Sequence, residues 1–135
     1  LVFRGTTTGW PGNASVQKVG VTPVTSDPAV ATIFATEAAN SGEGVVLVAS
    51  REGLPLVRGN VLANLEAEIG VAMAPAEFAA RATAIPLAEA QAALAKIGVS
   101  VPSTVTKAEL SRILNETGKL SAEQTAEFVR LTGGG

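Results

Sequence analysis

The strongest constraint on the fold is a change in the pattern of helix start and stop signals at Pro86. This proline opens a predicted helix that runs to Ile97 and ends at Gly98, because proline is favoured in the first helical turn and glycine just beyond the last. Two capping boxes open two further helices, over about 106–117 and 121–131. The last third of the chain is therefore predicted to be helical.

The first 85 residues mix predicted strands with helix. The continuous apolar run 45–49 has the pattern of a buried strand. Turn formers make 51–60 a predicted loop, 14–19 fits a short helix, and 78–85 fits either helix or strand. Further strands are predicted at 1–3, 20–25 and 68–73. Because strands and helices do not alternate regularly, the pattern predicts an α+β fold rather than α/β.

One helix in this portion has a clear start. Asp27 is a favoured N-cap residue and Pro28 a favoured first helical residue. These signals predict a helix over 28–39, ended by the turn formers at 40–42. Its apolar residues recur at i, i+3, i+4 and i+8, and the predicted buried face is Val30, Ile33, Phe34 and Ala38.

Composition restricts the chemistry that the chain can perform. The 135 residues fit one domain, and 47% of them are hydrophobic, which is enough for a normal core. Histidine, cysteine and tyrosine are absent, which excludes Ser-His-Asp and Cys-His catalysis and leaves acid–base work to Asp, Glu or Lys. The net charge of −2 gives no overall basic surface for nucleic acid. No apolar run reaches the ~20 residues of a membrane-spanning helix.

Three short motifs follow one another in the first 85 residues. They are Phe3-Arg4-Gly5, then Val24-Thr25-Ser26-Asp27-Pro28 with Ala31 and Phe34-Ala35, then Glu66-Ala67-Glu68-Ile69. The two glutamates, at i and i+2, share one face if the segment is extended. Each motif alone has an ordinary explanation, as a surface arginine, a helix N-cap cluster and a pair of solvated carboxylates. Their occurrence together in this order is the unusual feature.

The ordered set resembles the mono-ADP-ribosyltransferases of the Arg-Ser-Glu class. It looks most like the toxin domains at the C-termini of bacterial polymorphic toxins, including Rhs-type and type VI secretion effectors. The resemblance implies a split antiparallel β core with flanking helices in a single domain, with residues 1–85 as its catalytic, β-rich portion and 86–135 as a helical extension. The sister class built on His-Tyr-Glu is excluded, because the chain contains neither His nor Tyr.

The resemblance implies that the chain breaks the nicotinamide–ribose bond of NAD. Glu68 would be hydrogen-bonded to a ribose hydroxyl and would stabilise the positive charge that develops on the ribose. Glu66 would face the acceptor, orient a guanidinium and assist proton removal. NAD is the substrate, and no metal is implied, because the reaction needs only charge stabilisation and positioning.

The residues implied to bind NAD are Arg4, Gly5, Thr25, Ser26, Trp10 and Phe34. The planar guanidinium of Arg4 suits the NAD phosphates or ribose. Thr25 and Ser26 would hydrogen-bond the ribose and hold Glu68. Trp10 could contact NAD or cover the edge of the core, and Phe34 could stack on nicotinamide or, as its helical position favours, pack in the core.

The chain departs from the family pattern in the middle motif. Residues 24–26 read Val-Thr-Ser where the family has Ser-Thr-Ser, so the first hydroxyl is missing. Either Thr25 carries its role, or the register is off by one. Glu52 and Glu77 are the alternative carboxylates if the Glu66–Glu68 pair is assigned wrongly.

The function implied is that of a mono-ADP-ribosyltransferase toxin. In the family Glu-x-Glu accompanies arginine acceptors, so the implied partner is a protein arginine in a competing or host cell, with RNA a weaker alternative. The implied setting is delivery into the target cytoplasm as the C-terminal part of a larger effector, with a cognate immunity protein and no membrane partner. Two alternatives stay open: an NAD glycohydrolase on the same scaffold, and a non-enzymatic interaction domain in which Arg4, Thr25 and Glu68 lie far apart.

Overall fold

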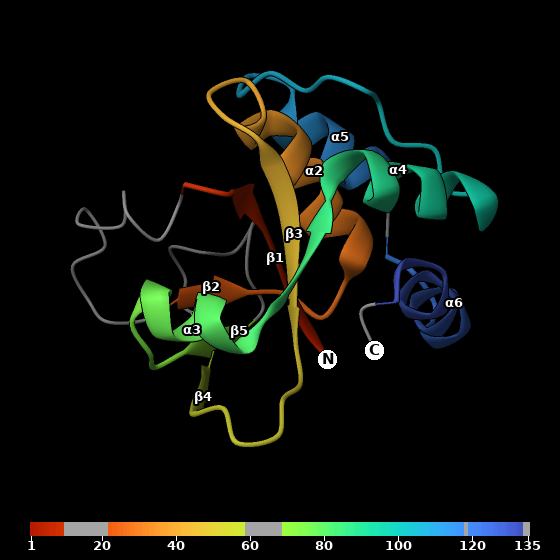
Figure 1. Cartoon of the computed structure of the whole chain (residues 1–135). Coiled ribbons are helices and arrows are strands. Elements are labelled where there is room, and N and C mark those ends of the chain that lie inside the picture. The colour runs from red at the N-terminus through yellow and green to blue at the C-terminus, as the bar shows by residue number, and fades with distance from the viewer. Residues whose placement is uncertain (10–21, 59–68, 118, 134–135) are drawn as a thin grey trace.

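The structure, a computed structural model, describes residues 1–9, 22–58, 69–117 and 119–133 (Figure 1). The strands are β1 (Val2–Thr7), β2 (Thr22–Val24), β3 (Gly44–Ala49), β4 (Leu56–Arg58), β5 (Ile69–Val71) and β6 (Thr83–Pro86). The helices are α2 (Pro28–Ala38), α3 (Pro75–Arg81), α4 (Leu87–Lys96), α5 (Leu110–Thr117) and α6 (Ala122–Thr132). The fold is α+β, as the sequence predicts.

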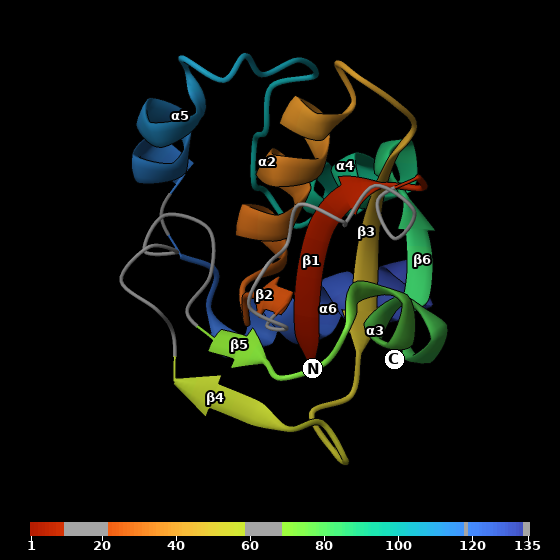
Figure 2. The same cartoon turned by 90° about the vertical axis from the view of Figure 1, so that its left-hand side faces the viewer.

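The described strands form two three-stranded antiparallel sheets. The first has the order β1-β3-β6 and the second the order β2-β5-β4. In Figure 2 the first sheet stands upright, and the second lies near the end of it where the chain begins. One isolated bridge joins them: the Phe3 N–H donates to the Thr25 carbonyl at 2.7 Å, and the Thr25 N–H donates to the Phe3 carbonyl at 2.9 Å. The start of β1 is therefore anchored to both sheets.

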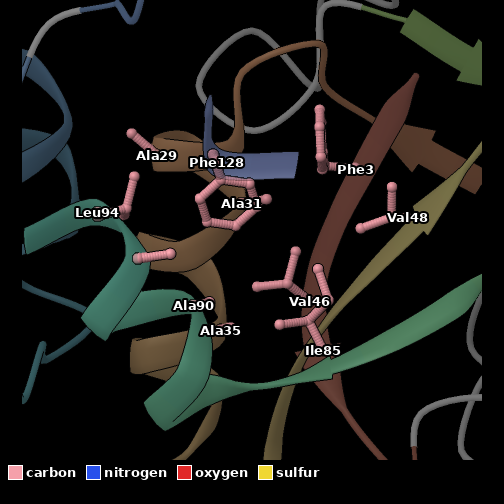
Figure 3. Close-up of a cluster of buried hydrophobic side chains, with 11 residues drawn as sticks. Phe3, Ala29, Ala31, Ala35, Val46, Val48, Ile85, Ala90, Leu94 and Phe128 are labelled. Carbon is pink, nitrogen blue, oxygen red and sulfur yellow. The ribbon is translucent and has the colours of Figure 1, made fainter. Parts of the chain in front are cut away.

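The main core lies between the first sheet and helices α2, α4 and α6 (Figure 3). Phe3 of β1 meets Phe128 of α6 edge to face, with ring centroids 6.0 Å apart and an interplanar angle of 81°, a favoured aromatic arrangement. The other face of the sheet, which carries Val2 and Leu47, packs with Phe78 of α3 in a second cluster. Neighbouring residues of β1 and β3 thus alternate between two cores, because successive strand residues point to opposite faces.

The start of α2 is as predicted. Asp27 is the N-cap, its Oδ1 accepts from the Ala29 N–H at 2.9 Å, and Pro28 opens the first turn. The predicted apolar face, however, is wrong in part, since Ile33 is buried but Val30, Phe34 and Ala38 are only half-buried. Apart from Pro28 and Ile33, the buried side chains of this helix are small, namely Ala29, Ala31, Thr32, Ala35 and Thr36.

The reason for this difference is the close approach of α2 to β1. A Cβ atom on Gly5 would lie 1.7 Å from the Ala31 carbonyl oxygen and 2.6 Å from the Ala35 nitrogen. Only small helix residues fit against a strand at this separation. Thr32 and Thr36 are buried because their hydroxyls donate to the helix carbonyls of Pro28 and Thr32, at 2.7 and 2.8 Å.

The helical third follows its predicted start signals with small shifts. The capping box between Ser121 and Gln124 is complete at the start of α6. A second box joins Thr106 and Glu109, where two hydrogen bonds from Thr106 lower the pKa of the Glu109 carboxyl, although the regular helix begins only at Leu110. Pro86 flanks α4 as its N-cap rather than opening it, because it is the last residue of β6.

In the middle of the chain, one prediction is wrong and one open alternative is resolved. The predicted loop 51–60 contains β4. Turn formers on both sides of this short strand made the segment look like a loop, and the strand is held by its pairing with β5. The ambiguous segment 78–85 is helix followed by strand, since it holds the end of α3 and most of β6. The short helix predicted over 14–19 lies outside the described residues. None of the helices described is long and apolar enough to cross a membrane.

Candidate functional site

A small recess lies beside the bridge that joins the two sheets. In the described part of the chain it is lined by Phe3, Arg4, Gly5, Val24, Thr25, Ala31 and Phe34. These residues come from β1, from β2 and the residue that follows it, and from α2. Its volume is about 10 Å³, which is room for roughly one water molecule. The first two sequence motifs therefore meet at one place in the fold.

Arg4 is held at the recess by the strand that carries it. β1 pairs with β3 along its whole length, with Arg4 opposite Leu47. The flanking residue Phe3 meets Phe128 of α6, and Gly5 lies against Ala31 of α2, so Arg4 is fixed between two tightly packed neighbours. Its side chain is half-buried and its Nε atom is shielded from solvent. A partly desolvated guanidinium on a rigid strand suits the binding of an anion or a sugar hydroxyl.

Thr25 is fixed on both its backbone and its side chain. Its backbone pairs with Phe3, and the residue is only 3% exposed. Its Oγ1 accepts from the Asp27 N–H at 3.1 Å. A hydroxyl carries one donor as well as its acceptor sites, so Thr25 can still donate its proton to another group. The recess thus contains a buried hydroxyl that is oriented by the turn into α2.

Phe34 lies on the wall of the recess rather than in the packed core. It is half-buried, and among the described residues it belongs to none of the three buried clusters. Its helical position favoured the core, and the ring is only partly covered there. An aromatic ring on the wall of a recess that Arg4 and the buried Thr25 also line is available to stack on a flat heterocycle.

Ser26 is separated from the other predicted NAD-binding residues. It lines a different depression, formed by Leu1, Ser26, Arg51, Leu120, Ala122, Thr125, Ala126 and Val129. Neighbouring residues of an extended chain point in opposite directions, so Thr25 and Ser26 face different sides. The structure brings together Arg4, Gly5, Thr25 and Phe34, and it places Ser26 apart from them.

The predicted catalytic pair Glu66 and Glu68, with Trp10, lies outside the described residues. The next residue, Ile69, is described: it begins β5 and pairs with Val24 at the end of β2. The alternative carboxylates Glu52 and Glu77 are exposed, in the turn after β3 and in the first turn of α3, away from the residues that line the recess. The described residues contain no cluster of three or more carboxylates that could hold a metal ion.

Asp27 bonds to a residue of the recess through its N–H, which donates to Thr25 Oγ1, although the sequence indicates it only as a helix cap. It is 5% exposed, and its second carboxylate oxygen, Oδ2, accepts from the Leu120 N–H at 3.2 Å. The cap was predictable because its partner is two residues away. The bond to Leu120 joins residues 93 positions apart in the sequence, and no local pattern predicts such a contact.

Comparison of the chain with protein-family models, with curated proteins and with solved structures finds no match. The site is therefore interpreted from its own residues and from the order of the three motifs.

Proposed function

We propose that this protein is a mono-ADP-ribosyltransferase of the Arg-Ser-Glu class, with its NAD site at the recess and an ADP-ribosyltransferase-like split β core. The observation that carries the proposal is the pairing of the strands. Phe3, next to Arg4, pairs with Thr25, and Val24, next to Thr25, pairs with Ile69, next to Glu68. Described residues of all three motifs are thus linked by strand pairing, although they are widely separated in sequence.

The third motif enters the argument through Ile69, its last residue, which is described and pairs with Val24. Because Val24 directly precedes Thr25, this pairing supports a site in which one bound ribose meets both the second and the third motif. The non-enzymatic alternative expects the motifs to lie far apart, and the contact of Arg4 and Thr25 with one recess argues against it.

The proposed reaction uses these groups without a metal. The bond between the ribose C1′ and the nicotinamide nitrogen breaks, and its electron pair leaves with nicotinamide, which becomes neutral. The Glu68 carboxylate stabilises the positive charge that develops on the ribose, and the Thr25 hydroxyl donates to that carboxylate and orients it. A guanidinium nitrogen of the acceptor bonds to C1′, and Glu66 takes the proton that this nitrogen releases.

Arg4 and Phe34 bind the two ends of the reacting half of NAD in this proposal. Arg4 holds the phosphates or the ribose, and Phe34 stacks on the nicotinamide ring. Because the recess has room for about one water molecule, these two half-buried side chains have to move apart when the ring enters. Val24 stands where the family pattern has its first hydroxyl residue. It is 1% exposed and packed in the second core cluster. Thr25 therefore supplies the hydroxyl.

The acceptor and the biological setting are proposed from the order of the three motifs. The Glu-x-Glu pair supports a protein arginine as acceptor, in a toxin domain that is delivered into a target cell and neutralised by an immunity protein. The chain would act as one domain, since Phe128 of the helical third packs directly on Phe3 beside the site.

Transfer of labelled ADP-ribose from NAD into a bacterial lysate tests the proposal. We expect the wild type to label a discrete macromolecule, and Arg4→Lys to reduce labelling at least tenfold, because an ammonium cannot reproduce the planar two-point contact of a guanidinium. Arg130→Lys is the matched control, since Arg130 is exposed and bonds only Glu127 among the described contacts. Release of free ADP-ribose without labelling would instead identify a glycohydrolase, and intact NAD in every reaction would refute both enzyme hypotheses.

A further inference from the structure

We infer that Asp27 is a positioning residue for the NAD site and that, through it, the segment before α6 sets the catalytic rate. The inference rests on the proposed function and concerns residues that the three motifs do not assign to the reaction. The contacts that carry it form one chain of hydrogen bonds from the helical third to the recess.

The chain begins at Leu120, whose N–H donates to Asp27 Oδ2 at 3.2 Å. The other oxygen of the same carboxylate accepts from the Ala29 N–H at 2.9 Å. The Asp27 side chain is therefore held from two directions, by α2 and by the segment that leads into α6. Because the residue is 5% exposed, water does not replace either bond readily.

The Asp27 backbone passes this restraint on to the site. Its N–H donates to Thr25 Oγ1 at 3.1 Å, and this bond fixes the direction in which the Thr25 hydroxyl can donate. In the proposed reaction that hydroxyl orients the Glu68 carboxylate. A shift of Asp27 would misdirect the hydroxyl without removing any group that touches NAD. When a group near the reaction is misplaced rather than removed, the loss of rate appears in the chemical step and therefore in kcat.

A second contact attaches α6 to the other side of the site. Phe128 packs against Phe3, whose backbone pairs with Thr25 and whose neighbour is Arg4. The helical third, which offers no catalytic group of its own, thus contacts the site through both Phe128 and Leu120.

Asp27→Asn separates the two bonds of the carboxylate. Asparagine is as good an N-cap as aspartate, so Oδ1 can still accept from Ala29, but the Nδ2 that replaces Oδ2 donates and cannot accept from Leu120. In assays of nicotinamide release, we expect kcat to fall about tenfold, with KM for NAD changed less than twofold. Exchange of the Leu120 amide with solvent should become at least tenfold faster.

A double-mutant cycle distinguishes positioning from general loosening. If Asp27 acts through Thr25, then Asp27→Asn should change kcat less than twofold in a Thr25→Val background, because the hydroxyl it directs is gone. Thr106→Ala, which removes a cap of α5 away from Asp27, should leave kcat unchanged. An equal tenfold effect in both backgrounds, or no effect of Asp27→Asn in the active wild type, would overturn the inference.

A variant that does not fold and a wild type that is inactive have different consequences for the inference. If Asp27→Asn does not fold, Asp27→Ser replaces it under the same criteria, because serine caps α2 but is too short to reach Leu120. If the wild type itself releases no nicotinamide, the proposed function fails and the inference fails with it. Failure of the inference alone is recognised by a wild type that is active and a variant that matches it.

Discussion

Gly5→Ala is expected to cost at least about 3 kcal/mol of folding free energy, at or beyond the upper end of overpacking effects. The added Cβ would lie 1.7 Å from the Ala31 carbonyl oxygen, and the Ala35 nitrogen would be 2.6 Å away. Both are backbone atoms of α2, so no side-chain rotation relieves the clash. Since small domains are stable by only about 5–15 kcal/mol, a large part of the stability would be lost. Urea denaturation followed by circular dichroism measures it.

Gly42→Ala provides the matched control for this substitution. The nearest atoms to a Cβ at Gly42 belong to the Thr7 side chain, at 3.2 and 3.3 Å, and this half-buried side chain can shift by a few tenths of an ångström. We expect a change of less than about 1 kcal/mol, typical of surface substitutions that meet a yielding neighbour. Equal stability of Gly5→Ala and wild type would show that α2 does not lie against β1 at this distance.

Glu68→Gln and Glu66→Gln are expected to have different effects on activity. Glu68→Gln should reduce both nicotinamide release and ADP-ribose transfer by at least about 10²-fold, since a neutral amide cannot stabilise the developing positive charge. Glu66→Gln should reduce transfer to a protein arginine by a similar factor but lower nicotinamide release less than about tenfold, because it acts on the acceptor. Both variants keep the shape of the side chain.

Glu77→Gln and Glu52→Gln are the controls for this pair. Both residues are exposed and lie away from the recess, so we expect wild-type rates of release and transfer. Loss of activity in either control, with an active Glu68→Gln, would show that the carboxylates are assigned wrongly. Equal losses of release and transfer in Glu66→Gln would contradict the division of roles between the two glutamates.

The features that could be predicted from the sequence depend on neighbouring residues. The cap at Asp27 and the capping box at Ser121 each involve residues two or three positions apart, so a short pattern specifies them. The buried strand at 45–49 was equally readable, because both faces of β3 are covered and its residues are all apolar or glycine.

The features that could not be predicted depend on the approach of distant segments. The buried face of α2 is set by its contact with Gly5 on β1, which leaves Phe34 on the wall of the recess instead of in the core. Ser26 was grouped with Thr25 because the two are adjacent, yet they line different depressions. The pairing of Phe3 with Thr25 and of β2 with β5 brings described residues of the three motifs together, and no local pattern specifies these pairings.

The most direct test of the account is to map NAD onto the protein by NMR. The amide signals of isotopically labelled Glu68→Gln, in which we expect NAD to stay intact, would be followed as NAD is added. We expect the largest shifts at Arg4, Gly5, Thr25 and Phe34, with little change at Ala126 in the separate depression that Ser26 lines. Shifts confined to that depression, or no shifts at millimolar NAD, would contradict the claim that the recess is an NAD site.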